Sequence, residues 1–180
     1  MDMLKIAAWN SNGLQQGALE TKTFLYNNNI DILLVSETHF TTKSYIKILY
    51  YTIYDTKHPS GKAHGGTAVV IKNDIKHHLH SQVSKEHIQA TTVTVQTSSN
   101  QLQLSAVYVP PRHKITSQMW EEYFQHLGDK YIAAGDYNSH STHYGDQELL
   151  HHEVELWKTT LETITSIYYP REDRHTGRQT

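Results

Sequence analysis

Three apolar stretches of the sequence each end in a polar side chain that can bind a metal ion or move a proton. Asn10, Glu37 and Asp136 follow these stretches directly, and Asn138 lies two residues beyond Asp136. Carboxylate and carboxamide oxygens are hard ligands, and Mg²⁺ typically takes one or two protein carboxylates together with water and substrate phosphate. Each residue also has a purely structural interpretation, as a turn former or an exposed strand end. Type and spacing alone therefore indicate a candidate metal site and no more.

Composition limits the classes of protein that this chain can belong to. With 180 residues the chain fits one domain, predicted to span residues 1–180, and no apolar run is long enough to cross a membrane. The absence of cysteine excludes disulfides, thiolate nucleophiles and cysteine zinc sites. The net charge of -2 argues against binding nucleic acid by overall charge, so any DNA contact must be local. The first residues lack a secretory signal pattern, which predicts an intracellular protein of the nucleus or cytoplasm.

Hydrophobic periodicity predicts more strand than helix. Strands are expected over residues 4–10, 30–35, 50–54, 67–71, 92–96, 102–108 and 131–135, with extended chain again at 167–170. Helical spacing is expected from Leu14 to about residue 27, from about Ser117 to Gly128, and from about Gln147 to Ile164. Residues 171–180 are polar and are predicted to form a flexible tail. Hairpin signals without strict strand–helix alternation favour an α+β layered sandwich over a parallel α/β sheet.

Histidine is unusually frequent, with 14 residues that include the pairs His77-His78 and His151-His152. Such pairs resemble a metal-binding tract, which would predict tight Zn²⁺ or Ni²⁺ binding independent of Glu37. Because they lie in polar surroundings without a fixed ligand spacing, solvated surface positions are the simpler interpretation.

Five short motifs, in chain order, resemble those of the endonuclease/exonuclease/phosphatase superfamily. They are Trp9-Asn10, Ser36-Glu37-Thr38-His39, Gly65-Gly66-Thr67-Ala68, Val107-Tyr108-Val109-Pro110-Pro111 and Gly135-Asp136-Tyr137-Asn138. Residues 30–40, 62–66 and 110–113 look more narrowly like the apurinic-type endonuclease domain of jockey-like insect non-LTR retrotransposons. The resemblance implies a four-layer, DNase I-like αββα sandwich, in which two packed mixed sheets lie between helices and the last strands are missing.

The resemblance also implies roles for individual residues and a cofactor. Glu37 and Asn10 would hold a divalent metal ion, Mg²⁺ or Mn²⁺, with Glu37 as the principal ligand. Asp136 would orient or deprotonate the attacking water, Asn138 would hydrogen-bond that water or the phosphate, and Tyr108 would place its phenol against the scissile phosphate. DNA is the implied partner. A metal would supply the positive charge that phosphodiester cleavage needs and that a net-acidic protein lacks.

Further residues near these motifs are candidates for substrate contact. His140 and His143 follow the Asp136 motif where the resembled domains carry a loop ending in Trp-Gly, here Tyr144-Gly145. His39 matches a family position, and Arg112 belongs to a local basic cluster in the loop after residue 111.

The match fails at the carboxyl end of the sequence. The resembled domains continue into further strands with an Asp-x-x-Asp stretch and a closing Ser-Asp-His, for which this sequence has no matching position. We therefore expect a C-terminally truncated domain, in which loss of a general acid or base lowers the rate by about 10²–10⁴. A reverse transcriptase region would lie downstream in a full-length element.

Four hypotheses follow from the sequence. The first is a metal-dependent DNA endonuclease domain that nicks target DNA, derived from a non-LTR retrotransposon and weakened or inactivated by truncation. The second is a catalytically dead remnant of the same fold with weak metal or DNA binding. The third is a phosphatase or phosphodiesterase acting on small molecules or lipids, and the fourth is the histidine-rich metal-binding protein.

Overall fold

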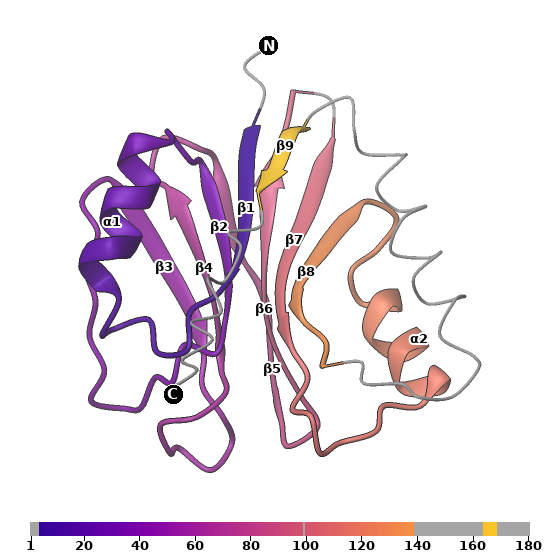
Figure 1. The fold of residues 1–180 in the computed structure, drawn as a ribbon. Coiled ribbons are helices and arrows are strands. Elements are labelled where there is room, and N and C mark those ends of the chain that lie inside the picture. Colours follow the sequence, from indigo (N-terminus) through magenta and orange to yellow (C-terminus); the bar gives the residue numbers. More distant parts are fainter. Residues whose placement is uncertain (1–3, 99, 139–163, 169–180) are drawn as a thin grey trace, which may run out of the picture.

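The computed structural model describes residues 4–98 and 100–138 and the backbone of residues 164–168. Within them the chain forms two β-sheets that lie face to face, with one helix on the outer side of each (Figure 1). The four layers are therefore α1, sheet, sheet and α2, as the αββα expectation requires. None of the helices in the described ranges is long and apolar enough to span a membrane.

The first sheet has five strands in the order β3-β4-β2-β1-β9. Their bounds are β1 Leu4–Asn10, β2 Ile32–Ser36, β3 Tyr51–Thr56, β4 Thr67–Lys72 and β9 Ile164–Tyr168. Strand β1 pairs in parallel with β2 and with β9, whereas β2 and β3 each pair antiparallel with β4. The sheet is mixed, and the parallel pairing of β1 and β2 puts their carboxyl ends side by side.

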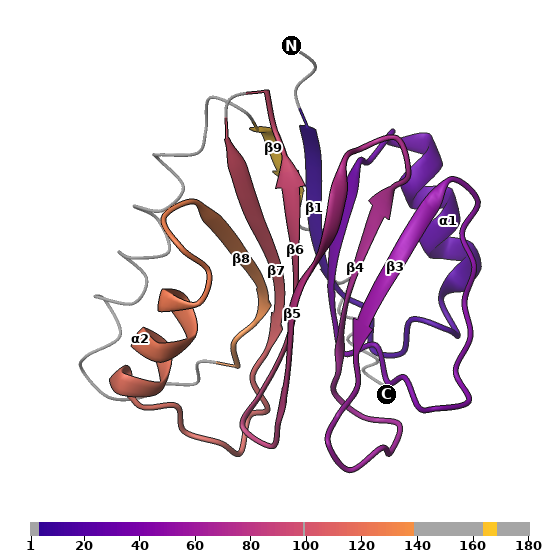
Figure 2. The same cartoon turned by 180° about the vertical axis from the view of Figure 1, so that it is seen from behind.

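The second sheet has four strands in the order β5-β6-β7-β8. Their bounds are β5 His77–Lys85, β6 Ile88–Gln96, β7 Gln101–Tyr108 and β8 Tyr131–Asp136. Three consecutive strands form antiparallel hairpins, and β8 returns parallel to β7 (Figure 2). Strand β6 ends at Gln96 and β7 begins at Gln101, so the hairpin reverses direction where the sequence predicts a turn.

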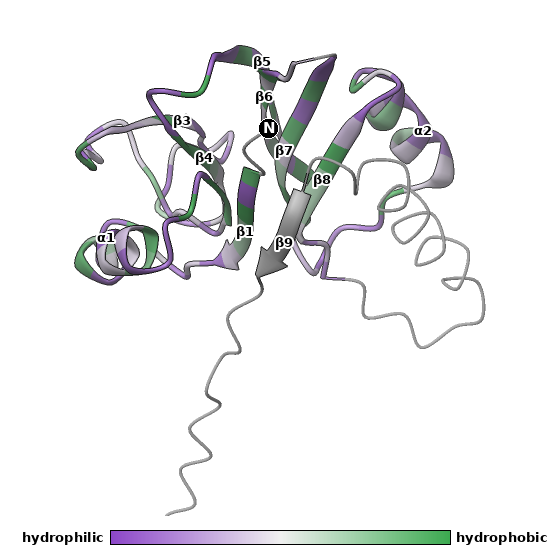
Figure 3. Ribbon diagram, turned by 90° about the horizontal axis from the view of Figure 1, so that it is seen from above, coloured by the Kyte–Doolittle hydropathy of each residue, from purple (hydrophilic) through white to green (hydrophobic). Residues whose placement is uncertain are grey.

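Apolar side chains fill the space between the sheets and the space beneath each helix. The central cluster joins Ile6, Ile32 and Val69 of the first sheet to Val93, Leu104 and others of the second. In the view from above, hydrophobic colour lies along the strands, and the two helices cover opposite outer faces (Figure 3). Strand β2 is buried at all five positions, as expected for a strand covered on both faces.

Both described helices are bounded by recognisable local signals. Helix α1 spans Ala18–Asn27, starting four residues after Leu14 because residues 14–17 form turns, and ends at the asparagine run as predicted. Helix α2 spans Ser117–Gln125, and the Thr116 side chain caps it by accepting a hydrogen bond from the Met119 backbone N–H. Its apolar stripe packs Trp120, Tyr123 and Phe124 against the second sheet.

The sequence analysis missed one strand and placed the end of one helix wrongly, and part of its prediction lies outside the described residues. Strand β5 was not predicted, because its side chains are mostly polar and exposed, as suits the edge of a sheet. The predicted helix from Gln147 to Ile164 is wrong at its end, where Ile164 begins strand β9 and pairs with Leu4. The rest of that helix and the 171–180 tail lie outside the described residues.

Candidate active site

Each sheet delivers two of the predicted site residues at the carboxyl ends of parallel strands. In the first sheet Asn10 ends β1 and is paired in register with Ser36, so that Glu37 follows directly beside it. In the second sheet Tyr108 ends β7 and is paired with Asp136, the last residue of β8. The facing of the two sheets then brings these pairs together at one edge of the sandwich.

The side-chain amide of Asn10 joins carboxylates from the two sheets. Its Nδ2 donates to Glu37 Oε1 at 3.0 Å and to Asp136 Oδ2 at 2.8 Å. Its Oδ1 accepts a hydrogen bond from the Asn12 backbone N–H at 3.1 Å, which fixes the orientation of the amide. The sequence prediction that these three residues converge is therefore met, although Asn10 and Asp136 are 126 residues apart.

Tyr108 lies against the two carboxylates with its ring nearly buried. Burial is the largest of the causes that together raise its pKa to about 12, and the others are the negative charges of Glu37 and Asp136 and a hydrogen bond to Glu37. The phenol consequently keeps its proton at neutral pH. It can therefore act as a hydrogen-bond donor toward an anion that enters the site.

The backbone around Glu37 is held in an uncommon conformation from two sides. Glu37 has a φ of 53° and His39 a φ of 55°, values that non-glycine residues seldom adopt. From one side the Gly13 N–H donates to the Glu37 carbonyl at 2.8 Å. From the other side the His39 N–H donates to the Gly65 carbonyl at 2.9 Å. Strained backbone conformations persist at functional sites when several contacts hold them, as these hydrogen bonds do here.

The Gly65-Gly66 turn is itself anchored to the second sheet by Gln89. This side chain is fully buried, and its Oε1 accepts from the Gly66 N–H at 3.3 Å while its Nε2 donates to the Lys85 carbonyl at 2.6 Å. A Cβ at Gly65, where φ is 57°, would lie 2.7 Å from Gln89 Oε1 and 3.1 Å from the Tyr108 ring. Glycine is thus required at this position. The sequence analysis did not identify Gln89. The one feature that could have indicated it is an amide side chain among apolar and small side chains of a strand.

The segment after β8 forms a tight turn that positions Asp136. The Asn138 N–H donates to Asp136 Oδ1 at 3.0 Å, and Asn138 Nδ2 donates to the Val109 carbonyl at 2.9 Å. Asn138 has a φ of 44°. Its amide nitrogen therefore holds the turn to the end of β7, while its proposed contact with water or phosphate stays a prediction.

Of the remaining residues predicted to contact substrate, one lies at the site, one lies in an exposed loop and two are outside the described residues. His39 Nε2 lies 3.3 Å from Glu37 Oε2, so its ring belongs to the site. Arg112 is exposed in the loop between β7 and α2. His140 and His143 lie outside the described residues.

The donor set fits a hard divalent cation. Glu37 and Asp136 offer two carboxylates, a number that Mg²⁺ typically uses in proteins, whereas the carboxamide oxygen of Asn10 accepts from the Asn12 N–H and its Nδ2 faces both carboxylates. Across residues 4–98 and 100–138, no group of three or more histidine, aspartate or glutamate side chains is arranged to hold a metal ion. The paired histidines His77 and His78 lie on the edge strand β5, at the opposite end of the second sheet from Asp136.

Comparison of the sequence with known proteins shows which family the chain belongs to. The model of the Endonuclease/Exonuclease/phosphatase family matches residues 7–179. The chain is 37% identical over 143 residues to the RNA-directed DNA polymerase from mobile element jockey of Drosophila melanogaster, covering 79% of this chain and 16% of that protein. It is 32% identical over 148 residues to the probable RNA-directed DNA polymerase from transposon BS of the same species, covering 81% and 16%. The chain thus spans about a sixth of the length of these relatives.

Solved structures share the fold at low sequence identity. The endonuclease domain of TRAS1, a telomere-specific non-LTR retrotransposon, superposes with a TM-score of 0.61 at 17% identity, covering 85% of this chain and 70% of that one. The AP endonuclease LMAP from Leishmania major gives a TM-score of 0.63 at 14% identity, covering 92% and 72%. With the family model matching nearly the whole length and the strand ends assembled as described, the chain belongs to the endonuclease/exonuclease/phosphatase family.

Proposed function

We propose that this chain is a divalent-metal-dependent DNA endonuclease domain of a jockey-like non-LTR retrotransposon, hydrolysing a phosphodiester of target DNA. The observation that carries the proposal is the single Asn10 amide that links Glu37 and Asp136 across the two sheets, 3.0 and 2.8 Å away. Sequence identity to the jockey protein supports the retrotransposon origin, and the names of the two structural neighbours, both endonucleases, support a nuclease activity.

The residues of the site suit the separate tasks of phosphodiester hydrolysis. Glu37 would hold Mg²⁺ or Mn²⁺, and Asn10 would join it as a ligand with its amide turned so that Oδ1 instead of Nδ2 faces Glu37. The ion, when bound, supplies positive charge next to the phosphate. Asp136 accepts from the Asn138 N–H through Oδ1 and from Asn10 Nδ2 through Oδ2, and the second lone pair of Oδ2 can orient a water and accept its proton. Tyr108, whose phenol stays protonated, can donate to a phosphate oxygen as negative charge develops there.

Nicking of supercoiled plasmid tests the proposal. Purified full chain should relax plasmid only when Mg²⁺ or Mn²⁺ is present. Glu37→Gln and Asp136→Asn should each reduce the rate by about 10²-fold or more, because each removes one of the two carboxylates and keeps the side-chain size. The gel-based rate of conversion to open circle is the measurement.

Glu121→Gln is the matched control, since Glu121 is exposed on α2, away from the site. It should nick at the rate of the unmodified chain, and circular dichroism should show all variants folded. A protein that is folded and binds metal but remains inert at every Mg²⁺ and Mn²⁺ concentration would contradict the proposal and favour a catalytically dead member of the fold.

A further inference from the structure

The segment between β2 and β3 exposes an alternating row of side chains, Lys43, Tyr45, Lys47 and Leu49, which we name the 43–49 strip. Tyr45 is 74% exposed and Leu49 58%, and both lysines are exposed. The residues between them point inward: Ile48 is 1% exposed, and Ile46 packs against the cluster beneath α1. This alternation gives the strip one outward face that carries two positive charges and an aromatic ring.

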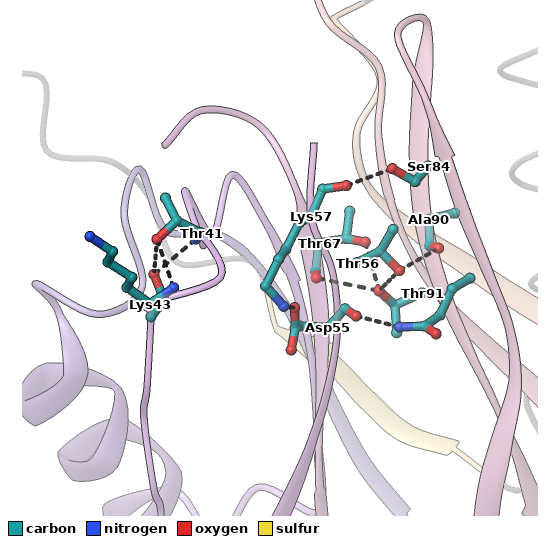
Figure 4. Close-up of polar contacts among 11 residues, drawn as sticks. Thr41, Lys43, Asp55, Thr56, Lys57, Thr67, Ser84, Ala90 and Thr91 are labelled. Atoms are coloured by element: carbon teal, nitrogen blue, oxygen red, sulfur yellow. Dashed lines mark hydrogen bonds and ion pairs between the residues drawn. The ribbon is translucent and has the colours of Figure 1, made fainter. Parts of the chain in front are cut away.

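The backbone of the 43–49 strip is fixed at both ends. At its start the Thr41 N–H donates to Ser44 Oγ at 2.9 Å and the Lys43 N–H to Thr41 Oγ1 at 3.2 Å. Lys43 extends away from this turn in Figure 4. At its end the Tyr26 hydroxyl donates to the Leu49 carbonyl at 3.0 Å. A surface held in this way loses little conformational entropy when a ligand binds.

The charge and the location of the strip indicate what it fits. Residues 41–50 contain two lysines and no acidic residue, so the face is complementary to an anionic chain. The strip begins four residues after His39, whose ring contacts Glu37 at 3.3 Å. From there it leads toward the opposite end of the first sheet, where Tyr51 pairs with Lys72. Lys43 is therefore the residue of the strip nearest along the chain to the proposed cleavage site.

An exposed tyrosine between two lysines favours an unpaired strand over a duplex. Base stacking on aromatic side chains requires a free base face, which a paired duplex offers only at its ends, while lysines follow the backbone of either form. At about 3.3 Å of extended backbone per residue, Lys43 and Lys47 are up to about 13 Å apart, with Tyr45 midway between them. A stretched strand can thus stack one base while its flanking phosphates reach both lysines.

We infer that the 43–49 strip binds a single nucleic-acid strand, with Tyr45 stacking on a base and Lys43 and Lys47 contacting phosphates. Its relation to a scissile bond rests on the proposed function, but binding itself needs no catalysis. The substrate class it adds is DNA that carries an unpaired segment.

Fluorescence anisotropy with a labelled oligothymidylate of about 12 nucleotides, in EDTA so that no cleavage occurs, tests the inference. Tyr45→Ala should weaken binding about tenfold, whereas Tyr45→Phe, which keeps the stacking ring, should bind within about twofold of the unmodified chain. The affinity K falls as salt rises, so log K plotted against log salt has a negative slope. Removing both lysines as Lys43→Ala/Lys47→Ala should make this slope less negative by about 1.4, the value for two single-strand phosphate contacts.

Lys76→Ala/Lys130→Ala is the matched control, because both lysines are exposed and lie at the end of the second sheet opposite Asp136. It should leave oligonucleotide affinity unchanged within about twofold. Equal affinity of Tyr45→Ala and the unmodified chain would overturn the inference. So would an equal loss of affinity for a blunt duplex of the same length, which would assign the strip to duplex backbone instead.

Nicking of plasmid is read separately, so the two proposals can fail independently. An unmodified chain that never nicks but binds the oligonucleotide through Tyr45 would refute the endonuclease activity and leave the strip as a binding surface. If the unmodified chain nicks plasmid but Tyr45→Ala binds the oligonucleotide as tightly as the unmodified chain, the endonuclease proposal stands and the binding role of the strip is refuted.

Discussion

At the scale of single residues, the site concentrates uncommon backbone conformations. Glu37, His39 and Asn138 all have positive φ, and none is glycine. All three belong to motifs from which the sequence analysis predicted site residues, but the sequence could not predict their backbone conformation. That conformation depends on hydrogen bonds from distant segments, such as that from the Gly13 N–H to the Glu37 carbonyl.

Close to the Gly65 turn of this site, His58 is expected to make the stability of the protein depend on pH. Its Nδ1 accepts from the Ser60 backbone N–H at 3.2 Å, and its ring lies 3.9 Å from that of His64. Burial lowers its pKa from 6.5, as do the nearby His64 and His113, against the opposing effect of Glu86. A histidine whose pKa is lowered by folding is protonated more readily when unfolded, so its contribution is present above pH 6.5 and is lost as pH falls below that value.

We therefore expect the melting temperature of the protein to fall as pH is lowered from 7 to 5, and to fall less steeply in His58→Gln. Protonation of His58 puts a hydrogen on Nδ1, which then cannot accept the hydrogen bond from the Ser60 N–H, so acid should destabilise the folded protein. Thermal melts followed by circular dichroism across this pH range measure the difference. A slope in His58→Gln as steep as that of the unmodified chain would contradict the assignment to His58.

At the scale of elements, Gln89 ties the second sheet to the turn that holds Glu37. We expect Gln89→Ala to lower the free energy of unfolding by about 1–3 kcal/mol, because it leaves the buried Gly66 N–H and Lys85 carbonyl without this partner. It should also raise the Mg²⁺ concentration needed for half-maximal nicking, since the Glu37 loop loses its support. Urea titration and Mg²⁺-dependent nicking are the two measurements.

Gln96→Ala provides the comparison, because Gln96 is exposed at the other end of the same strand. Its effect on stability should stay within about 0.5 kcal/mol. If Gln89→Ala lowers stability but leaves the Mg²⁺ dependence of nicking unchanged, Gln89 is structural and does not position Glu37.

The elements themselves were predicted with uneven success, for a physical reason. Strands with buried apolar residues, such as β2 and β4, are recognisable because burial on both faces demands a continuous apolar run. Strand β5 lies at an edge and presents mostly polar side chains, so its pairing with β6 comes from backbone hydrogen bonds that leave little pattern in the sequence. The same limit applies to the 43–49 strip, whose alternation is visible only once burial is known.

At the scale of the whole molecule, buried threonines join the two sheets. Thr91 of β6 donates to Thr56 Oγ1 of β3 at 2.8 Å and lies 2.8 Å from Thr67 Oγ1 of β4, and all three side chains are buried (Figure 4). The residues alone favoured a layered α+β sandwich, and the family resemblance implied the two facing sheets. Neither predicted this polar contact, because it depends on which strands face each other across the interior.

We expect Thr91→Val to destabilise the protein by about 1–3 kcal/mol, since it keeps the side-chain shape but leaves buried hydroxyls short of a partner. Thr23→Val on the exposed face of α1 should change stability by no more than about 0.5 kcal/mol. Chemical denaturation gives both values. Equal stability of Thr91→Val and the unmodified chain would mean that apolar packing alone holds the sheets together.

The linkage made by Asn10 has a consequence for how the interior of this protein can vary. Its amide reaches one carboxylate on each wall of the sandwich, and hydrogen bonds of this kind weaken once donor and acceptor separate beyond about 3.2 Å. A larger or smaller side chain deep between the walls can change their spacing by such an amount while the protein remains folded. If the chain cleaves DNA as proposed, substitutions in the interior should reduce the rate of cleavage before they unfold the protein. The cleavage rate would then report the spacing of the two sheets more sensitively than stability does.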